Sequence, residues 1–366
     1  MRTPICDQLG IAQPIFAFTP SEHVAAAVSR AGGLGVLGCV RFNDAEELDA
    51  VLDWMDENTD GKPYGVDIVM PAKVPEEGSA TDLGKHIPDE HRKFVDDTLR
   101  KLGVPPLPAD GDPAREGVLG WLHSVARSHI DVALRHPIKL IANALGSPPK
   151  DVIDLAHEHG VPVAALAGKA KHARAHVDNG VDIVVAQGTE AGGHTGEIAT
   201  MVLVPDIVDA VGADAHVLAA GGIGSGRQIA AALSLGAGGV WMGSYWLTTS
   251  EYQLGNQAVQ RALVAAESDQ TVRARIYSGK PARLLKTKWT DAWFEDGAPE
   301  ALPMPLQNLL VSEAHQRIAA ANDPDVVAMP VGQIVGRMNA VRPVAELMDE
   351  LLAEFDETMR RLDKIR

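Results

Sequence analysis

The chain has few cysteines and few aromatic residues for its length of 366 residues. Only Cys6 and Cys39 are present, and Phe, Trp and Tyr together make up 4% of the sequence. Two thiols are too few for a disulfide scaffold or a cysteine-rich metal site, so the sequence indicates a reducing compartment. The shortage of aromatic residues, beside abundant Ala and Val, favours helices and buried parallel strands over an aromatic-rich antiparallel sandwich.

Basic residues are also scarce. The chain has 33 Lys and Arg against 49 Asp and Glu, a formal net charge of −16, which argues against a general affinity for nucleic acid or an anionic membrane. No apolar run approaches the roughly 20 residues that span a bilayer, and residues 1–7 lack the basic and apolar regions of a signal peptide. We therefore expect a cytoplasmic protein that acts on a small-molecule substrate, without a nucleic-acid or membrane partner.

Several common site motifs are missing. The sequence contains no H-E-x-x-H run and no paired C-x-x-C, so it predicts no metal site. It contains neither a G-x-S-x-G nucleophile elbow nor a Walker A sequence. Gly222, Gly224 and Gly226 lack the spacing of a G-x-G-x-x-G dinucleotide fingerprint and follow the seventh strand unit rather than the first. A Rossmann-type dinucleotide site is therefore not predicted.

Short apolar runs alternate with amphipathic helical stretches about eight times along the chain. Strand–helix units in this number, with short links and within roughly 250 residues, are typical of a (β/α)8 TIM barrel, whose active site lies at the carboxyl ends of the strands. The predicted strands are residues 14–18, 34–38, 64–70, 138–142, 161–166, 183–186, 216–220 and 239–242. A doubly wound parallel sheet remains the alternative, because sequence alone does not prove that the sheet closes.

Two predicted helix starts carry capping residues. Ser21 precedes a helix that stops near Gly32, and a Ser at this position accepts a hydrogen bond from the first turn. Asn43, with Glu46 three residues further on, matches a capping box at the start of the next helix.

The regular alternation is interrupted twice. Residues 72–113 are rich in proline, glycine and charge, contain one predicted helix at residues 90–102, and resemble an insertion. Residues 250–366 are predicted to be mostly helical. We therefore expect a barrel made of residues 1–71 and 114–249, and a lid region that caps the barrel mouth and consists of the insertion and the helical tail. Alternatively, the tail meets a second subunit in a homodimer.

One loop carries the most specific functional pattern. The run A-Q-G-T-E-A-G-G-H-T-G occupies residues 186–196, directly after an apolar strand. Its glycines let the backbone approach a flat ligand, and His194 can move a proton near neutral pH. We interpret the segment as an active-site loop in which His194 transfers a proton or polarises the substrate. Glu190 is either a second acid or base, or a residue that stabilises the loop.

Turns of small residues follow the last two predicted strands. Gly221 and Gly222 expose backbone N–H groups ahead of a helix that Ser225 can cap, and the N-terminus of that helix favours an anion. Gly243 and Ser244 form the second turn. Because many barrels bind phosphate with the loops after strands seven and eight, the two turns together predict a phosphate site.

These motifs resemble the nitronate monooxygenase family, formerly called 2-nitropropane dioxygenases. The resemblance rests on the run at residues 186–196, the A-A-G-G-I turn at residues 219–223 and the S-G-K-P-A-R run at residues 278–283. It covers about residues 1–285 and fades in the tail. It implies an FMN-dependent TIM barrel in which His194 is the catalytic histidine. The implied FMN contacts are Gly221, Gly222, Gly243 and Ser244 for the phosphate, and Ala17, Phe18, Asp67, Gln187 and Gly193 for the ring.

The chain departs from the family pattern in three ways. Phe18 and Thr19 stand where family members usually carry Pro-Met, and Asp67 stands where they often place Asn. An anionic carboxylate near the flavin would disfavour the reduced, anionic ring and shift its potential downward. The insertion at residues 72–113 is also longer than expected. These departures bear on the substrate more than on the fold or on FMN.

The resemblance implies oxidation of alkyl nitronates with O2, without a nicotinamide cofactor. The alternative is an FMN-dependent reductase of an enoyl thioester that uses NAD(P)H, because flavin enoyl-ACP reductases share these motifs and a large lid suits a bulky acyl-CoA. His194 would then polarise the thioester carbonyl or assist protonation. A flavin-binding protein without turnover has no need of a poised histidine. A relative of inosine-monophosphate dehydrogenase needs a cysteine in an active-site loop, and neither Cys6 nor Cys39 lies in the loop that this chemistry uses.

Overall fold

The computed structural model describes residues 1–70, 84–107 and 123–365. Its centre is a closed barrel of eight parallel strands, in which β1 pairs with both β2 and β9. Closure confirms the predicted TIM barrel and excludes the doubly wound sheet. The barrel strands are β1 (Ile15–Thr19), β2 (Leu34–Gly38), β3 (Tyr64–Asp67), β4 (Ile141–Asn143), β5 (Val163–Ala167), β6 (Ile183–Gln187), β8 (His216–Ala220) and β9 (Gly239–Met242).

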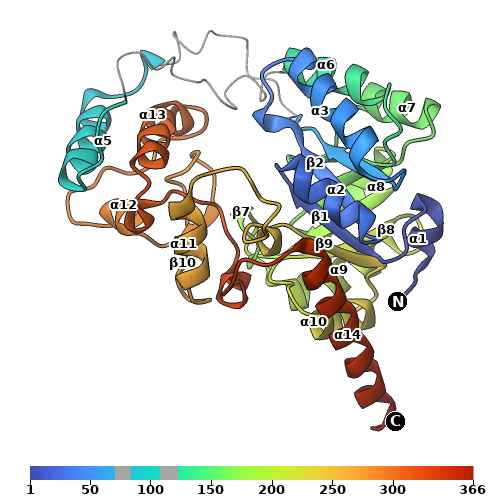
Figure 1. Ribbon diagram of the computed structural model, residues 1–366. Helices are drawn as coiled ribbons and strands as arrows, with labels where there is room; N and C mark the ends of the chain where they lie inside the picture. Colours follow the sequence, from blue (N-terminus) through green and yellow to red (C-terminus); the bar gives the residue numbers. More distant parts are fainter. Residues whose placement is uncertain (71–83, 108–122, 366) are drawn as a thin grey trace.

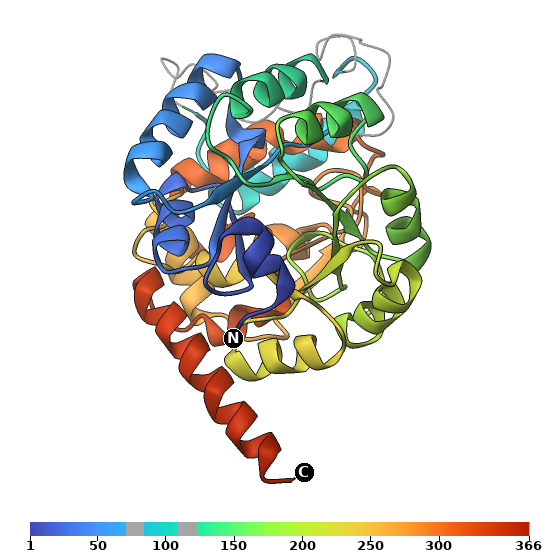
Figure 2. The same cartoon turned by 90° about the vertical axis from the view of Figure 1, so that its right-hand side faces the viewer.

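Helices form a ring around the strands (Figure 2). Two of the predicted caps are confirmed: Ser21 Oγ accepts a hydrogen bond from Val24 N–H at 3.4 Å, and Ser225 Oγ accepts one from Gln228 N–H at 3.3 Å. The ring and its connections contain α2 (Glu22–Arg30), η1 (Cys39–Arg41), α3 (Ala45–Asn58), α6 (His123–Ala133), α7 (Lys150–Glu158), α8 (Ala170–Asp178), α9 (Thr200–Val211), α10 (Gly226–Ser234) and η3 (Ser244–Trp246).

The cap of α3 differs by one residue from the predicted one. Asp44 Oδ1 accepts a hydrogen bond from Glu47 N–H at 2.9 Å, and the Glu47 carboxylate accepts one from Asn43 N–H at 3.0 Å. The prediction that Asn43 and Glu46 cap this helix was therefore wrong. A carboxylate is a stronger acceptor than an amide oxygen, and Asp44 has the extended backbone that a cap requires.

The barrel interior is filled by apolar side chains from alternate strand positions. Phe16 and Val36 belong to this cluster and are fully buried. A short helix that the sequence analysis did not predict, α1 (Pro4–Leu9), contributes Ile5, Cys6 and Leu9 to the same cluster. Figure 2 shows α1 lying across the end of the barrel that faces the viewer. The side chains of α1 therefore complete the core at that end.

A helical body lies beside the barrel mouth (Figure 1). Its core includes Val95 of α5 and Trp289, Trp293 and Val311. The helix predicted at residues 90–102 is confirmed as α5, while residues 72–83 and 108–113 of the insertion lie outside the described residues. The body contains α5 (Asp89–Lys101), α11 (Gln257–Ala265), α12 (Lys288–Ala292), α13 (Leu306–Ala321), η4 (Pro324–Val326) and η5 (Gln333–Arg337).

The last helix, α14 (Val344–Asp363), leaves this body and packs against α10 and α2 of the barrel ring (Figure 1). The helices predicted for the tail are therefore present, and the final one covers the side of the barrel rather than its mouth. The homodimer and the capping role of the lid stay predictions. None of the helices in the described ranges is long and apolar enough to cross a membrane.

A small antiparallel sheet connects the helical body to the barrel. It consists of β10 (Thr271–Ala274), β11 (Ala282–Leu285) and the two-residue strand β7 (Gly193–His194), with β11 in the middle. Ala282 lies opposite His194 and Arg283 opposite Gly193. The loop after β6 is thereby fixed as a strand edge, a feature that the sequence analysis did not predict.

Two arginines hold the ends of this loop. Arg283 Nε donates to the Thr189 carbonyl at 2.9 Å, and Arg273 Nη2 donates to the Thr195 carbonyl at 3.1 Å. Arg273 Nε also donates to the Thr195 hydroxyl at 3.1 Å. Charge-assisted hydrogen bonds of this kind are stronger than neutral ones. The loop is therefore anchored from β10 and β11 rather than from the barrel alone.

Close approach of other parts of the chain explains two loop glycines. A Cβ on Gly188 would lie 2.0 Å from Thr200 Oγ1, and a Cβ on Gly192 would lie 2.7 Å from the Gly332 nitrogen. Gly193 differs, since it has a φ of 75° and no atom within 4 Å of an added Cβ. Only this third glycine leaves open space where a ligand could lie.

Glu190 stabilises the loop. Its Oε2 accepts hydrogen bonds from the Thr200 backbone N–H at 2.9 Å and from Thr200 Oγ1 at 2.8 Å. Thr200 is the first residue of α9, where backbone N–H groups lack helical partners and favour a negative charge. Of the two roles considered for Glu190, these contacts support the stabilising one.

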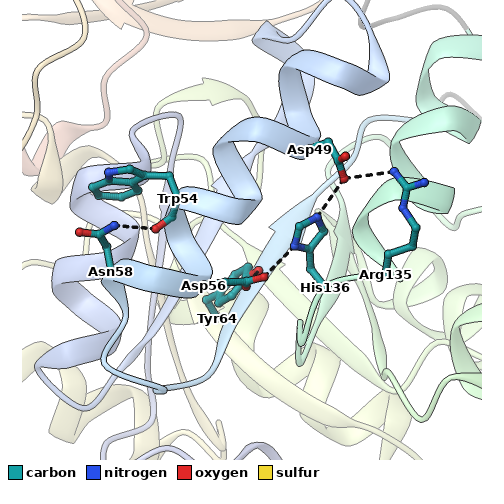
Figure 3. Close-up of polar contacts among 7 residues, drawn as sticks. All are labelled: Asp49, Trp54, Asp56, Asn58, Tyr64, Arg135 and His136. Carbon is teal, nitrogen blue, oxygen red and sulfur yellow. Dashed lines mark hydrogen bonds and ion pairs between the residues drawn. The ribbon is translucent and has the colours of Figure 1, made fainter.

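A polar cluster joins α3 to the turn that precedes β4 (Figure 3). His136 Nδ1 lies 2.8 Å from Asp56 Oδ2, and His136 Nε2 lies 3.1 Å from Asp49 Oδ1. The Tyr64 hydroxyl donates to the other oxygen of Asp56 at 2.5 Å, and Arg135 bonds Asp49 at 3.1 Å. Burial lowers the pKa of His136, but the hydrogen bonds to Asp56 and Asp49 outweigh it and raise that pKa above its ordinary value.

We expect Glu190→Gln to lower the free energy of unfolding by about 1–2 kcal/mol, because the amide keeps an acceptor for Thr200 but loses the negative charge. Thermal unfolding measures the change, with Glu197→Gln as the control, since Glu197 is an exposed glutamate of the same loop. A variant with unchanged stability and abolished turnover would instead identify Glu190 as an acid or base.

We expect His136→Gln to lower the free energy of unfolding by about 1 kcal/mol near pH 5.5, once solvent screening is allowed for. A raised pKa stabilises the fold fully below the ordinary value of about 6.5, and the contribution is lost as the pH rises through the folded value. The deficit should therefore shrink near pH 8.5. Denaturant unfolding at both pH values checks this, with the exposed His159→Gln as control. An equal deficit at both pH values would contradict the assignment.

Candidate active site

A cavity of about 300 Å³ lies at the carboxyl ends of the barrel strands. Phe18, Asp67 and Gln187 line it from the ends of β1, β3 and β6. The C-terminal part of the chain supplies another wall, which includes Tyr277 and Gly332. The cavity thus lies where a TIM barrel places its active site, and the helical body and its sheet help to enclose it.

The cavity brings together the predicted site residues with one exception. Ala17 is absent from its lining and is fully buried in the apolar cluster between the strands and the outer helices. A contact from Ala17 to a ligand would have to come from its backbone. The predicted residues that line the cavity are Phe18, Asp67, Gln187, Gly193, His194, Gly221, Gly222, Gly243 and Ser244. Their binding and catalytic roles stay predictions.

Aromatic rings form an apolar part of the lining. The Phe18 and Trp241 rings stack with centroids 6.3 Å apart, and both line the cavity. A Cβ on Gly38 would come within 3.1 Å of the Phe18 ring, and one on Gly243 would lie 3.7 Å from it. The small residues at the end of β2 and directly after β9 therefore make room for the phenyl ring that this chain carries near the end of β1.

The glycine turns present backbone donors to the cavity. Gly221 and Gly222 have φ angles of 104° and 70°, which favour glycine. Among the described residues, no backbone acceptor is found for the N–H groups of Gly221, Gly222 and Gly243. Ser244 Oγ accepts a hydrogen bond from Gly332 N–H at 2.9 Å, which leaves its own proton to donate. These groups suit an anion such as a phosphate.

The N-terminus of α10 does not take part in this cradle. Gly226 N–H donates to Glu354 Oε2 at 2.9 Å, and Arg227 Nε donates to Glu354 Oε1 at 2.7 Å. Glu354 belongs to α14, so a carboxylate from the tail already occupies the helix end that was expected to attract an external anion. This helix end therefore binds an anion, as expected, but the anion is a carboxylate of the chain itself, because α14 packs directly on α10.

His194 is held on the small sheet as a neutral imidazole. Its Nε2 lies 2.6 Å from Ser278 Oγ. Burial lowers the pKa of His194 to about 4, and the positive charge of Lys280 acts in the same direction. The ring is therefore uncharged at neutral pH, with one ring nitrogen carrying a proton.

No functional role was predicted for Ser278 or Tyr277 from the sequence. Ser278 is 2% exposed and bonds His194, while Tyr277 lines the cavity and stacks on His315 at 5.1 Å. Ser278 opens one of the motifs that carry the family resemblance, so the sequence did contain a pattern there. No residue spacing could show that this motif pairs with the loop some 80 residues earlier.

Asp67 differs electrostatically from the expectation. It is 2% exposed, and burial raises its pKa to about 7, while a hydrogen bond with the Ala144 backbone acts in the opposite direction. The carboxyl group therefore ionises less readily than an ordinary aspartate, which the expectation of an anionic carboxylate did not include. The cause is desolvation, which favours the protonated form and which the sequence does not show.

Comparison with known proteins gives matches along almost the whole chain. The family profile described as nitronate monooxygenase matches residues 4–354. A Mycobacterium tuberculosis protein, provisionally assigned as a monooxygenase, is 49% identical over 99% of this chain and 98% of its own length. A Staphylococcus aureus protein, provisionally assigned as a nitronate monooxygenase, is 26% identical over 98% of this chain and 99% of its own length.

Solved structures give a similar result. Nitroalkane oxidase from Streptomyces ansochromogenes is 28% identical with a TM-score of 0.80 and covers 98% of this chain and 99% of its own. FabK from Thermotoga maritima is 27% identical with a TM-score of 0.75, and each chain is covered completely. The enoyl reductase domain of MlnA from Bacillus amyloliquefaciens, at 14% identity, covers 98% of both chains with a TM-score of 0.67, and shows the fold alone.

The resemblance extends further than the sequence analysis expected. It does not fade after residue 285, since the family match continues to residue 354. The cavity explains why the later segment belongs to the same pattern, because Pro330, Gly332 and Ile334 line it. The chain therefore belongs to the nitronate monooxygenase family and is an oxidoreductase of that family.

Proposed function

We propose that this protein binds FMN in the cavity and oxidises alkyl nitronates with O2. The observation that carries the proposal is that His194 shares one cavity with the glycine turns after β8 and β9. An imidazole that can polarise a substrate and backbone N–H groups that can bind a phosphate therefore line the same cavity. Membership of the nitronate monooxygenase family and the likeness to a nitroalkane oxidase support this activity.

The residues present fit a flavin mononucleotide. Gly221 and Gly222 offer backbone N–H groups to its phosphate. Phe18 and Trp241 offer an apolar surface to its ring. Asp67 Oδ2 has no hydrogen-bond partner among the described residues, so a polar atom of the ring can satisfy it.

When bound, FMN would supply the redox chemistry, as an acceptor of electrons from the nitronate and a donor of electrons to O2. His194, neutral because of its low pKa, is a weak base but can offer a ring N–H to a nitronate oxygen. A nitronate has already lost its carbon-bound proton, so orientation matters more than proton abstraction. Ser278 fixes the imidazole, and the exposed Lys280 attracts the anionic substrate.

The second candidate is an FMN-dependent reduction of an enoyl thioester by NAD(P)H. The likeness to FabK over the complete chain favours it. In this reaction the N–H of His194 would polarise the thioester carbonyl. The same cavity residues would then act in a reaction whose electron donor is NAD(P)H rather than the nitronate. The need for NAD(P)H separates the two candidates.

Anaerobic titration of the purified, FMN-loaded protein tests the proposal. Loss of the oxidised flavin absorbance on addition of an alkyl nitronate, without any nicotinamide, is the expected result. A flavin that stays oxidised with nitronate but is reduced by NAD(P)H would contradict nitronate oxidation and support the enoyl-thioester reductase. A protein that cannot be loaded with FMN would exclude both candidates.

We expect His194→Ala to lower kcat/KM for the nitronate by about 100-fold or more, because the variant loses the ring N–H that would bind and orient the nitronate oxygen. Its Kd for FMN should change by less than about threefold. Steady-state kinetics and flavin fluorescence measure the two quantities, with His172→Ala, on the outer helix α8, as the control. Unchanged turnover in His194→Ala would refute the assignment of His194.

A further inference from the structure

One histidine and two aspartates with the spacing of metal ligands lie at the amino ends of the barrel strands. Asp53 and Asp56 are three residues apart on α3 and share one face of it, and His136 belongs to the turn before β4. Each offers one ligand atom, and these atoms lie within 4.8 Å of one another. Tyr64, which bonds Asp56, begins β3, whereas the cavity lies where the strands end. The cluster is therefore separate from the proposed flavin site.

The imidazole of His136 has a carboxylate at each ring nitrogen (Figure 3). Its Nε2 lies 3.1 Å from Asp49 Oδ1, and its Nδ1 lies 2.8 Å from Asp56 Oδ2. When Nε2 donates its proton to Asp49, a neutral ring turns the lone pair of Nδ1 toward the Asp56 carboxylate. Two facing lone pairs repel each other, so a cation must lie between them. This cation is either a second proton on the ring or a metal ion.

Asp53 favours the metal ion over the proton, because a proton on Nδ1 satisfies Asp56 alone. In the described part of the chain no side chain pairs with the Asp53 carboxylate, although it lies close to Asp56 and His136. The cluster contains the carboxylates of Asp49, Asp53 and Asp56 and the guanidinium of Arg135. A divalent cation beside a neutral imidazole contacts Asp53 and, together with Arg135, balances all three negative charges. A proton leaves one of them uncompensated.

The outer contacts of the cluster are those that orient metal ligands. Asp49 accepts from the Nε2 side of the imidazole and is itself held by Arg135 at 3.1 Å. The Tyr64 hydroxyl donates to Asp56 Oδ1 at 2.5 Å, which turns Oδ2 toward His136. A ligand histidine usually donates its other N–H to a carboxylate, and ligand carboxylates are in turn hydrogen-bonded. The ligand atoms of His136 and Asp56 are therefore positioned before an ion arrives.

We propose that His136 Nδ1, Asp53 and Asp56 bind a Zn2+ ion that links α3 to the turn before β4. An imidazole nitrogen with carboxylate oxygens suits Zn2+, whereas Mg2+ and Ca2+ prefer oxygen ligands alone. Bonds of about 2.0–2.2 Å place the ligand atoms of a tetrahedral site about 3.4 Å apart, so rotation of the Asp53 and Asp56 side chains closes the set. Asp53 is exposed, which leaves the fourth position to water. In the metal-free protein a proton on Nδ1 takes the place of the ion.

The motif search predicted no such site, because Asp56 and His136 are 80 residues apart. The ion would be structural rather than catalytic, since the amino ends of the strands in a TIM barrel serve stability. The inference does not depend on FMN or on the substrate, so it stands or fails separately from the proposed function.

Calorimetric titration of the EDTA-treated, full-length protein with Zn2+ at about pH 7.5 tests the proposal. We expect the wild type to bind one equivalent of Zn2+ that Asp53→Asn binds at least about tenfold more weakly. Asp53 pairs with no described side chain, so this substitution removes a ligand without breaking an existing contact. Glu57→Gln, an exposed carboxylate of the same helix, is the matched control and should keep the wild-type Kd. No binding by the wild type, or an equal Kd in Asp53→Asn, would overturn the inference.

Thermal unfolding gives a second readout. An ion that binds only the folded chain raises Tm, and Zn2+ at about 100 times its Kd should raise the wild-type Tm by about 3–5 °C. At the same concentration Asp53→Asn should show at most about half of this rise, and Mg2+ should leave the wild-type Tm unchanged. An equal rise in the wild type and Asp53→Asn would show that Zn2+ binds elsewhere and would refute the site.

Discussion

The antiparallel pairing of β7 with β11 is the constraint on which the site depends. The loop after β6 is rich in glycine, so ordering it costs more conformational entropy than ordering an average segment. Strand pairing opposite Gly193 and His194, with the arginine contacts at Thr189 and Thr195, offsets that cost. The imidazole is consequently positioned by chain segments that lie outside the barrel.

Burial acts in opposite directions on His194 and Asp67, two of the titratable side chains that line the cavity. It lowers the pKa of His194 to about 4 and raises that of Asp67 to about 7, so between these values both side chains are uncharged. The lining is then neutral, with an apolar aromatic part and fixed backbone dipoles at the glycine turns. Such a lining leaves the charge of the ligand itself as the dominant electrostatic feature of the cavity.

Local patterns predicted much of this arrangement. Alternating apolar runs identified the strands, and small residues after the last two strands identified the turns at Gly221 and Gly243, because these features depend on neighbouring residues alone. The position of α1, the pairing of β7 with β11 and the capture of the α10 N-terminus by Glu354 depend on contacts between distant segments. Desolvation at Asp67 is likewise a property of the folded interior and leaves no mark on residue spacing.

The division of the cavity between early and late parts of the chain has a consequence for biosynthesis. β9, which closes the barrel, ends at Met242, whereas Ser278, Ala282 and Gly332 emerge from the ribosome later. At about 5–20 residues per second, the last third of the chain takes on the order of 10 s to translate. A nascent barrel can therefore close well before its cavity is complete, and the full set of cavity-lining residues is available only late in the synthesis of the protein.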